Sequence, residues 1–217
     1  MRALRQLLQQ ASNPVNASAM SAYLRHQFVF FGIKKAELRP LTRLFLKEKA
    51  KATVIDWAFV CDCWAQPERE FHYVALDYIR AMKRHLLPQD LPRLRYLVEH
   101  HSWWDSVDDV AYSIGYLVKH FGELQQKMLD WATDDSFWVR RVAIIHQLGH
   151  KEAVNTELLT KIITHNLGSR EFFINKAIGW ALRDYAKYNA AWVRNFLREH
   201  HDQLAPLSVR EATKHLD

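Results

Sequence analysis

A short acidic and aromatic segment, HSWWDSVDD at positions 101–109, contains the residue types best suited to chemistry. If the segment is helical, Trp104 and Asp108 lie at positions i and i+4 on one face, and Ser102 can cap the helix. A carboxylate there can stabilise positive charge that develops on a sugar ring during glycosidic cleavage. The alternative is structural: the tryptophans are core residues and the aspartates are first-turn helix acids. That alternative explains Asp105 well, because the helix dipole favours an acid there, but it explains Asp108 beside an indole less well.

A second candidate pair, Trp180 and Arg141, lies further along the chain. Trp180 follows Gly179, and glycine costs a helix interior about 1 kcal/mol relative to alanine, so its presence indicates close packing or a ligand near the backbone. Indole faces attract cations, and an arginine can hold a phosphate with two hydrogen bonds. Together with Trp104 and Asp108, these residues could form a pocket that attracts a cation, stabilises positive charge on a sugar and holds a phosphate. Buried tryptophans and a structural arginine explain the same positions equally well.

The sequence gives little support to metal or nucleotide-cofactor chemistry. His146 and His150 have the i, i+4 spacing of a helical zinc pair, but Gln147 replaces the glutamate of the HExxH motif. Gly149 also indicates that the helix ends there. The chain has neither a P-loop nor a GxGxxG motif. We therefore expect no metal and no cofactor.

The chain is basic, because 30 Lys and Arg residues against 24 Asp and Glu residues give a net charge of +6, and its isoelectric point is about 9.3. Such a charge favours a polyanionic partner, with an attraction that weakens as salt rises. Basic residues that could follow a phosphate backbone recur along the chain; they are Lys34, Lys35, Arg39, Lys176, Arg183 and Arg210. For each of them the alternative is an ordinary solvated helix face.

The elements that must position these residues are predicted to be helices. Gly and Pro number six each, so together they make up 12 of 217 residues. This share of about 5.5% is well below the roughly 12% of an average protein, which argues against a β-sandwich or a Rossmann sheet. Five alanines recur at position differences of 36, 32, 34 and 35, each after a polar turn: Ala75, Ala111, Ala143, Ala177 and Ala212. Two antiparallel helices per roughly 35–45 residues are typical of an α-solenoid, and DDSFWVRRVA resembles a HEAT repeat. We predict an all-α, curved α-solenoid of antiparallel HEAT-like helical repeats, one domain over residues 1–217 with a basic concave face, rather than a bundle with accidental spacing.

Apolar periodicity also places individual helices. The first covers 4–11 and is broken by Ser12-Asn13-Pro14, and the second runs over 18–31 and ends at Gly32. Helices are further expected around 38–45 and 54–64. The second helices of the repeats are expected at 91–99, 122–131 and 158–166.

Several features indicate a cytoplasmic protein. Cys61 and Cys63 lack the CxxC spacing and are too few for a disulfide framework, which indicates a reducing compartment; one of them is expected to be buried. The start MRALRQLLQQ has no continuous apolar region, so we expect no signal peptide. No uncharged apolar run approaches the ~18 residues of a membrane span, so we expect no membrane association.

Four strings resemble the AlkD family of bacterial DNA alkylation-repair glycosylases: QPEREFHYVALDYI, SWWDSVD, REFFINKAIGWALRDYAK and LAPLSVREATKHL. The resemblance covers about residues 20–216. It implies a curved stack of HEAT-like repeats with duplex DNA on its concave basic face. It also implies hydrolysis of the N-glycosidic bond of cationic alkylpurines, such as N3-alkyladenine and N7-alkylguanine, in base excision repair without a metal or cofactor.

The resemblance also implies roles for particular residues. Asp108 matches the family's catalytic aspartate, and Trp104 and Trp180 match its two indoles beside the deoxyribose of the lesion. Arg141 matches an arginine near the DNA backbone, and Tyr23 matches a tyrosine that contacts DNA. Phosphate contacts after Gly32 would fall on Lys34, Lys35 and Arg39.

The implied mechanism needs no general acid, because alkylation at N3 or N7 already makes the purine a cationic leaving group. Asp108 would stabilise the oxocarbenium-like sugar and position water, while Trp104 and Trp180 favour the cationic transition state. Most glycosylases extrude the base, whereas this family is understood to leave the lesion stacked. Ala36 and Val209 depart from the proline and lysine common in relatives, which puts peripheral DNA affinity in doubt.

Two other functions stay open at this point. The chain could be a catalytically inactive DNA-binding HEAT-repeat protein or a protein-binding scaffold. An inactive relative should have lost Asp108 or one indole, and all three are present, which favours the enzyme. We expect it to act as a monomer on double-stranded DNA that contains alkylated purines.

Overall fold

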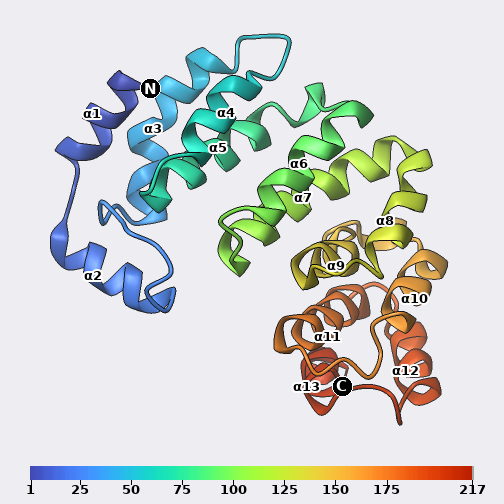
Figure 1. Cartoon of the computed structure of the whole chain (residues 1–217). Helices are drawn as coiled ribbons and strands as arrows, with labels where there is room; N and C mark the ends of the chain where they lie inside the picture. Colours follow the sequence, from blue (N-terminus) through green and yellow to red (C-terminus); the bar gives the residue numbers. More distant parts are fainter. Residues whose placement is uncertain (217) are drawn as a thin grey trace. The chain divides into compact units, whose positions relative to one another are not determined.

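The chain forms thirteen α-helices in the computed structural model, which describes residues 1–216 (Figure 1). Over these residues the structure contains no strand beyond a single bridge between Val29 and Glu68. The all-α prediction is therefore confirmed. The helices form two compact units, Met1–Leu86 and Leu87–Asp217, and the single domain over residues 1–217 stays a prediction. None of the described helices is long and apolar enough to cross a bilayer.

The first unit is built around one buried helix, α5, on which α3 and α4 pack. Ten residues of α5 are buried, Ala75 among them. α1 contributes the buried Leu4 and Leu8 and contacts α3. Cys63 on α4 is buried and Cys61 is exposed, as expected. The bounds are α1 (Arg2–Gln10), α2 (Pro14–Tyr23), α3 (Lys35–Lys49), α4 (Trp57–Trp64) and α5 (Arg69–Ala81).

The predicted helix over 18–31 is wrong. α2 begins earlier, at Pro14, because the Asn13 side chain caps it by accepting a hydrogen bond from the Asn16 backbone N–H at 3.1 Å. It ends at Tyr23, and Arg25 and His26 then adopt φ values of 56° and 57°, which a right-handed helix cannot contain. The apolar residues that follow therefore belong to a loop.

A buried carboxylate, Glu70 on α5, holds the end of this loop. It accepts hydrogen bonds from the backbone N–H groups of Phe31, Gly32 and Ile33 at 3.0, 2.8 and 3.0 Å. Gly32 has a φ of 94°, and a Cβ there would lie 1.9 Å from the Asn13 carbonyl oxygen. A distant acid and a close backbone approach thus fix the loop, and local periodicity cannot reveal either.

Replacing Glu70 by alanine is expected to lower the free energy of unfolding by about 3 kcal/mol or more, because three N–H groups near the core lose their acceptor. Urea denaturation measures the change. Glu37→Ala is the control, because Glu37 is exposed on α3, and it should stay within about 0.5 kcal/mol of wild type. A Glu70→Ala protein as stable as wild type would show that water replaces the carboxylate.

The second unit consists of two layers of helices (Figure 1). In the first layer, which we call the alanine layer, α7, α9, α11 and α13 each pack on the next; α6, α8, α10 and α12 pack against this layer. The bounds are α6 (Leu91–Glu99), α7 (Trp104–His120), α8 (Gln125–Trp131), α9 (Phe137–Ile145), α10 (Thr156–Thr164), α11 (Phe172–Ala186), α12 (Ala190–Glu199) and α13 (Pro206–Ala212).

The repeat is confirmed by the positions of its alanines. Ala111, Ala143, Ala177 and Ala212 lie on the four helices of the alanine layer, and none is more than 1% exposed. Small residues at these points let neighbouring helices approach closely, which is why the register was visible in the sequence.

The expected second helices agree with the structure within a few residues. The helix at 91–99 matches α6, and 122–131 divides into a 3₁₀ turn, Gly122–Leu124, and α8. The helix expected at 158–166 begins two residues earlier, because the Asn155 side chain caps α10 by accepting a hydrogen bond from the Leu158 N–H at 3.0 Å.

Candidate functional site

The structure brings Asp108 and Arg141 together across α7 and α9. The Nε and Nη2 groups of Arg141 donate to the two carboxylate oxygens of Asp108, each at 2.8 Å. Its Nη1 group donates to the backbone carbonyl of Phe173 on α11 at 2.7 Å. The side chains of Arg141 and Asp108 are only 4% and 17% exposed. One guanidinium therefore ties three successive helices of the alanine layer together and fixes the orientation of a nearly buried acid.

Burial raises the pKa of Asp108 above its ordinary value of 3.8, because a carboxylate loses hydration there. The Arg141 guanidinium opposes that shift through two hydrogen bonds and its charge, whereas the nearby acids Asp105 and Asp109 add to it. Arg141 is thus the group that favours the ionised form of Asp108.

The two candidate indoles lie on α7 and α11, the helices on either side of α9 in the alanine layer. Trp104 is the first residue of α7, so it lies one turn before Asp108 on the same face, as the spacing predicted. Trp180 lies seven residues after Phe173 on α11 and so shares the face that reaches Arg141. Both tryptophans are half-buried, which argues against a purely core role.

Ser102 does not cap α7, and that expectation is wrong. Its hydroxyl donates to the Val98 carbonyl at 2.6 Å, and the N-cap position is taken by Trp103 without a side-chain cap. Ser102 therefore closes the end of α6 instead. Asp105 is a buried first-turn acid, as the structural alternative expected.

An aromatic cluster, which sequence reasoning missed, lies beside Arg141. Trp138 and Trp103 lie 4.7 and 5.5 Å from Phe173 between ring centroids, and Phe137 stacks on it at 6.1 Å. The signal was present, because an aromatic pair opens each of α7, α9 and α11 or directly precedes it: WW at 103–104, FW at 137–138 and FF at 172–173. The cluster covers the Phe173 side of the Arg141 guanidinium, whose Cζ lies 5.9 Å from the Phe173 ring.

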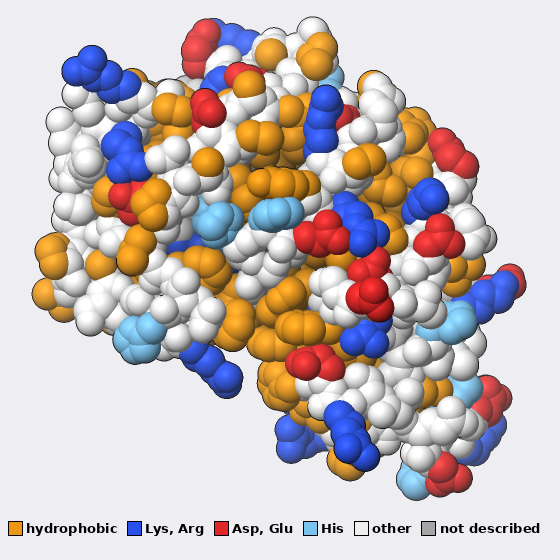
Figure 2. Space-filling model, in the orientation of Figure 1, with side chains coloured by type: hydrophobic (Ala, Val, Ile, Leu, Met, Phe, Trp, Pro, Cys, Tyr) orange, Lys and Arg blue, Asp and Glu red, His pale blue; other side chains and the backbone are white. Residues whose placement is uncertain are grey.

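In the second unit, two of the predicted DNA-binding cations are held by an acid. Lys176 and Arg183 of α11 contact the carboxylate of Glu211 on α13 at 2.8 and 2.7 Å. Arg210 is exposed on α13. On the face shown in Figure 2, Lys and Arg side chains are scattered, and several adjoin an acidic side chain. The cations are therefore partly organised by acids rather than spread over a uniformly basic surface.

In the first unit, the predicted DNA-binding residues flank the start of α3. Lys34 is exposed at the N-cap of α3, and the Lys35 ammonium lies 4.5 Å from the Tyr73 ring centroid. Arg39 lies 3.6 Å from Asp77. Tyr23 ends α2 and is 73% exposed. All four can reach a partner from solvent, and their contact with DNA stays a prediction.

Three cations on one face of α3 form a basic stripe, of which only the first, Arg39, was predicted from the sequence. Arg39, Arg43 and Lys47 are exposed and lie at i, i+4 and i+8, so they share one face of the helix. They line an open groove between α3 and α5, to which α5 adds Arg80. The four-residue spacing was the sequence signal that could have found this stripe.

The histidine pair is not arranged as on a helix. α9 ends at Ile145, and Gly149 has a φ of 76°, as its helix-ending role predicted. The Nδ1 atom of His146 lies 2.6 Å from the Ala143 carbonyl, and burial lowers the pKa of His146 to about 4, so the ring is neutral at neutral pH. Across the described residues, no group of three or more His, Cys, Asp or Glu side chains has the arrangement of a metal site.

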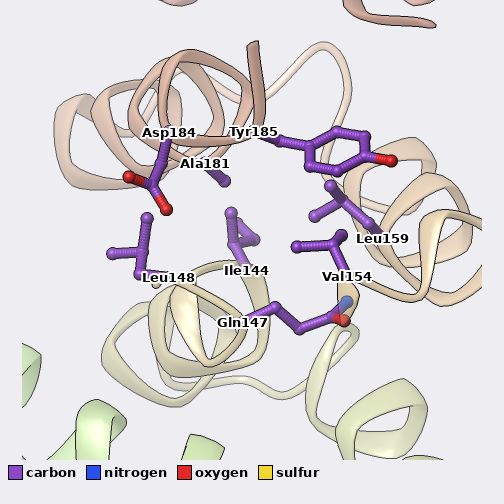
Figure 3. Close-up of a pocket in the computed structure, with 8 residues that line it drawn as sticks. All are labelled: Ile144, Gln147, Leu148, Val154, Leu159, Ala181, Asp184 and Tyr185. Atoms are coloured by element: carbon purple, nitrogen blue, oxygen red, sulfur yellow. The ribbon is translucent and has the colours of Figure 1, made fainter. Parts of the chain in front are cut away.

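A cavity inside the second unit is too small for a substrate. It lies where α9, α10 and α11 meet and has a volume of about 10 Å³, room for at most one water molecule (Figure 3). The labelled residues that line it are mostly apolar, with Asp184 and Gln147 at its edges. It is a packing void, and the candidate chemistry lies at the Asp108–Arg141 pair.

Over nearly its whole length the chain is similar to proteins described as DNA alkylation repair enzymes. A family model described as DNA alkylation repair enzyme matches residues 4–216. A solved structure described as a predicted DNA alkylation repair enzyme from Enterococcus faecalis shares 35% sequence identity, with a TM-score of 0.88. That match covers 94% of this chain and 96% of the other. The comparison with curated proteins finds no match.

Proposed function

The chain belongs to the DNA alkylation repair enzymes, and we propose that within this family it is a DNA glycosylase that hydrolyses the N-glycosidic bond of cationic alkylpurines. Its substrates would be N3-alkyladenine and N7-alkylguanine in duplex DNA. The observation that carries the proposal is a nearly buried carboxylate, Asp108 on α7, which Arg141 on α9 holds on both oxygens. The half-buried Trp104 lies on α7 and the half-buried Trp180 on α11, the next helix of the alanine layer after α9.

The chemistry that this site can supply is electrostatic. A purine alkylated at N3 or N7 is positively charged and leaves without protonation, so no general acid is required. As the glycosidic bond breaks, positive charge develops on the deoxyribose, and a fixed carboxylate stabilises that charge strongly where water is scarce. Asp108 would also accept a proton or hydrogen bond from the attacking water. The two indoles would face the sugar and favour its cationic form.

Arg141 would act mainly through Asp108. Three of the five N–H donors of a guanidinium are used, two by Asp108 and one by the Phe173 carbonyl. Two donors remain outside these contacts, but the side chain is only 4% exposed, so a DNA phosphate would reach them only at the edge of the site. We keep both roles in the proposal.

DNA would be held through its phosphates, because the chain has a net charge of +6 and exposed cations occur in both units. We propose contacts from residues of both units: Tyr23, Lys34, Lys35, Arg39, Arg141, Lys176, Arg183 and Arg210. We also propose that the protein works as a cytoplasmic monomer without metal or cofactor.

The proposed substrate class is tested by comparing the release of a charged base with that of an uncharged base. Two duplexes of the same sequence, one with 7-methylguanine and one with uracil, are incubated with the protein and the released bases are quantified. Release of 7-methylguanine without release of uracil is expected, because uracil has no charge and the site offers no acid to protonate it. Release of both bases at similar rates would contradict the proposed mechanism.

The basic stripe gives a prediction for binding. The double variant Arg43→Ala/Lys47→Ala should reduce the slope of log affinity against log salt by about 2 in magnitude, because two phosphate contacts are lost. Fluorescence anisotropy with an unmodified duplex measures it. The control is Lys127→Ala/Lys161→Ala, which removes two cations of α8 and α10 that are paired with Asp130 and Glu157. This variant should leave the slope near wild type. Equal slopes for wild type and the stripe variant would remove α3 from the DNA contact surface.

A further inference from the structure

One acid on α13, Glu211, organises a cluster of cations. Among the described residues its carboxylate contacts Lys176 at 2.8 Å, Lys214 at 2.7 Å and Arg183 at 2.7 Å. The side chain is 3% exposed, while those of Lys176 and Arg183 are 37% and 23% exposed. The neighbouring lysines lower the pKa of Glu211 to about 2, so it is ionised at every pH relevant to the protein. Three cations on one acid leave the cluster positive.

A glycine makes this arrangement possible. A Cβ at Gly179 of α11 would lie 2.5 Å from the Glu211 Cβ and 2.7 Å from the Ser208 carbonyl oxygen. The absence of that Cβ lets α13 approach α11 closely, and the Ser208 hydroxyl then donates to the Asn175 carbonyl at 2.8 Å. The close packing that Gly179 indicated in the sequence is thus the packing of Glu211 against α11.

The cations that Glu211 holds flank a candidate catalytic residue. Lys176, Trp180 and Arg183 are spaced by four and three residues, so they share one face of α11 with the indole in the middle. Resting on the proposed function, we propose that Glu211 is a positioning residue: it holds Lys176 and Arg183 on either side of Trp180, where they receive the phosphates next to the nucleotide under attack.

An acid can strengthen a DNA-binding surface if it holds the cationic side chains in place before DNA binds. Lysine and arginine side chains lose rotamer freedom when they bind a phosphate, and a carboxylate that already fixes them removes much of that loss. General electrostatics predicts the opposite effect, because an acid repels DNA. The two explanations therefore predict changes of opposite sign when Glu211 loses its charge.

The test is the affinity of Glu211→Gln for an unmodified, fluorescein-labelled DNA duplex, measured by anisotropy well below the unfolding temperature. We expect binding about 10-fold weaker than that of wild type, although the variant has one more net positive charge. Glu157→Gln, with the same charge change on an exposed α10 residue, should bind as well as wild type or slightly better. In a Lys176→Ala/Arg183→Ala background, Glu211→Gln should cause no further loss.

The outcomes separate this inference from the proposed function. If wild type binds the duplex and Glu211→Gln binds equally or more tightly, Glu211 does not position the cations, whatever its effect on stability. A further loss in the double-variant background would also overturn the inference, because Glu211 would then act by another route. If Glu211→Gln does not fold, Glu211→Asp, which keeps the charge and shortens the reach, should show the same sign of change. Failure of wild type to bind any duplex would overturn the proposed function itself.

Discussion

Replacing Asp108 by asparagine is expected to slow single-turnover release of 7-methylguanine from duplex DNA by about 100-fold or more. Asparagine has nearly the same shape and can still accept a hydrogen bond from Arg141, but it has no charge to stabilise the developing sugar cation. Affinity for the alkylated duplex should change little, because Asp108 does not attract phosphates. A loss in the rate at saturating protein, rather than in affinity, would mark a role in the chemical step.

Two controls make the Asp108→Asn result interpretable. Asp109→Asn changes the charge equally at the next position, about 100° around the helix, and should keep most of the wild-type rate. Circular dichroism and thermal unfolding show whether the variant is folded, because a buried arginine without its partner can cost about 3–5 kcal/mol. If a folded Asp108→Asn releases base at the wild-type rate, the catalytic group lies elsewhere.

Replacing Arg141 by methionine is expected to change how the rate of base release depends on pH. Asp108 stabilises a cation only when ionised, and burial raises its pKa, so the rate should fall as the pH decreases through that raised pKa. Arg141 opposes the rise. In Arg141→Met the pKa of Asp108 should therefore increase further, the acid limb of the rate profile should move to higher pH, and part of the rate should return as the pH is raised.

The control for this prediction is Arg140→Met, which removes the neighbouring arginine and should leave the acid limb where it is in wild type. A uniform loss of rate at every pH in Arg141→Met would show that Arg141 acts by holding DNA or the fold rather than by favouring the ionised acid. Arg141→Lys keeps the charge but not the two-pronged contact, so it should lie between wild type and Arg141→Met.

The sequence predicted those parts of the structure that depend on a regular spacing of residue types. The alanine register identified the helices that form one layer, since a small residue is needed wherever two helices approach closely. The i, i+4 relation of Trp104 and Asp108 followed from helical periodicity, and the level of Arg141 relative to Ala143 placed it in the next repeat. The Trp104–Asp108 relation depends on residues four positions apart, and the alanine register depends on a regular recurrence every 32–36 residues.

Features that depend on residues distant in sequence could not be predicted. The loop that follows α2 looks helical by periodicity, but Glu70 and the positive φ values of Arg25 and His26 determine its conformation. The sequence suggested Arg141 as a phosphate ligand, and it could not show that the guanidinium is buried and paired with Asp108. That Lys176 and Arg183 share one acid on α13 depends on the close packing at Gly179.

The most direct test of the proposed function is the release of 7-methylguanine from methylated duplex DNA by wild-type protein, compared with spontaneous loss in the same buffer. We predict release in proportion to added protein, with one abasic site formed for each base released, and loss of that release in Asp108→Asn. The contradicting result would be release by wild type no faster than the spontaneous rate, although the same preparation binds duplex DNA with an affinity that falls as salt rises. The chain would then be a DNA-binding member of its family without glycosylase activity.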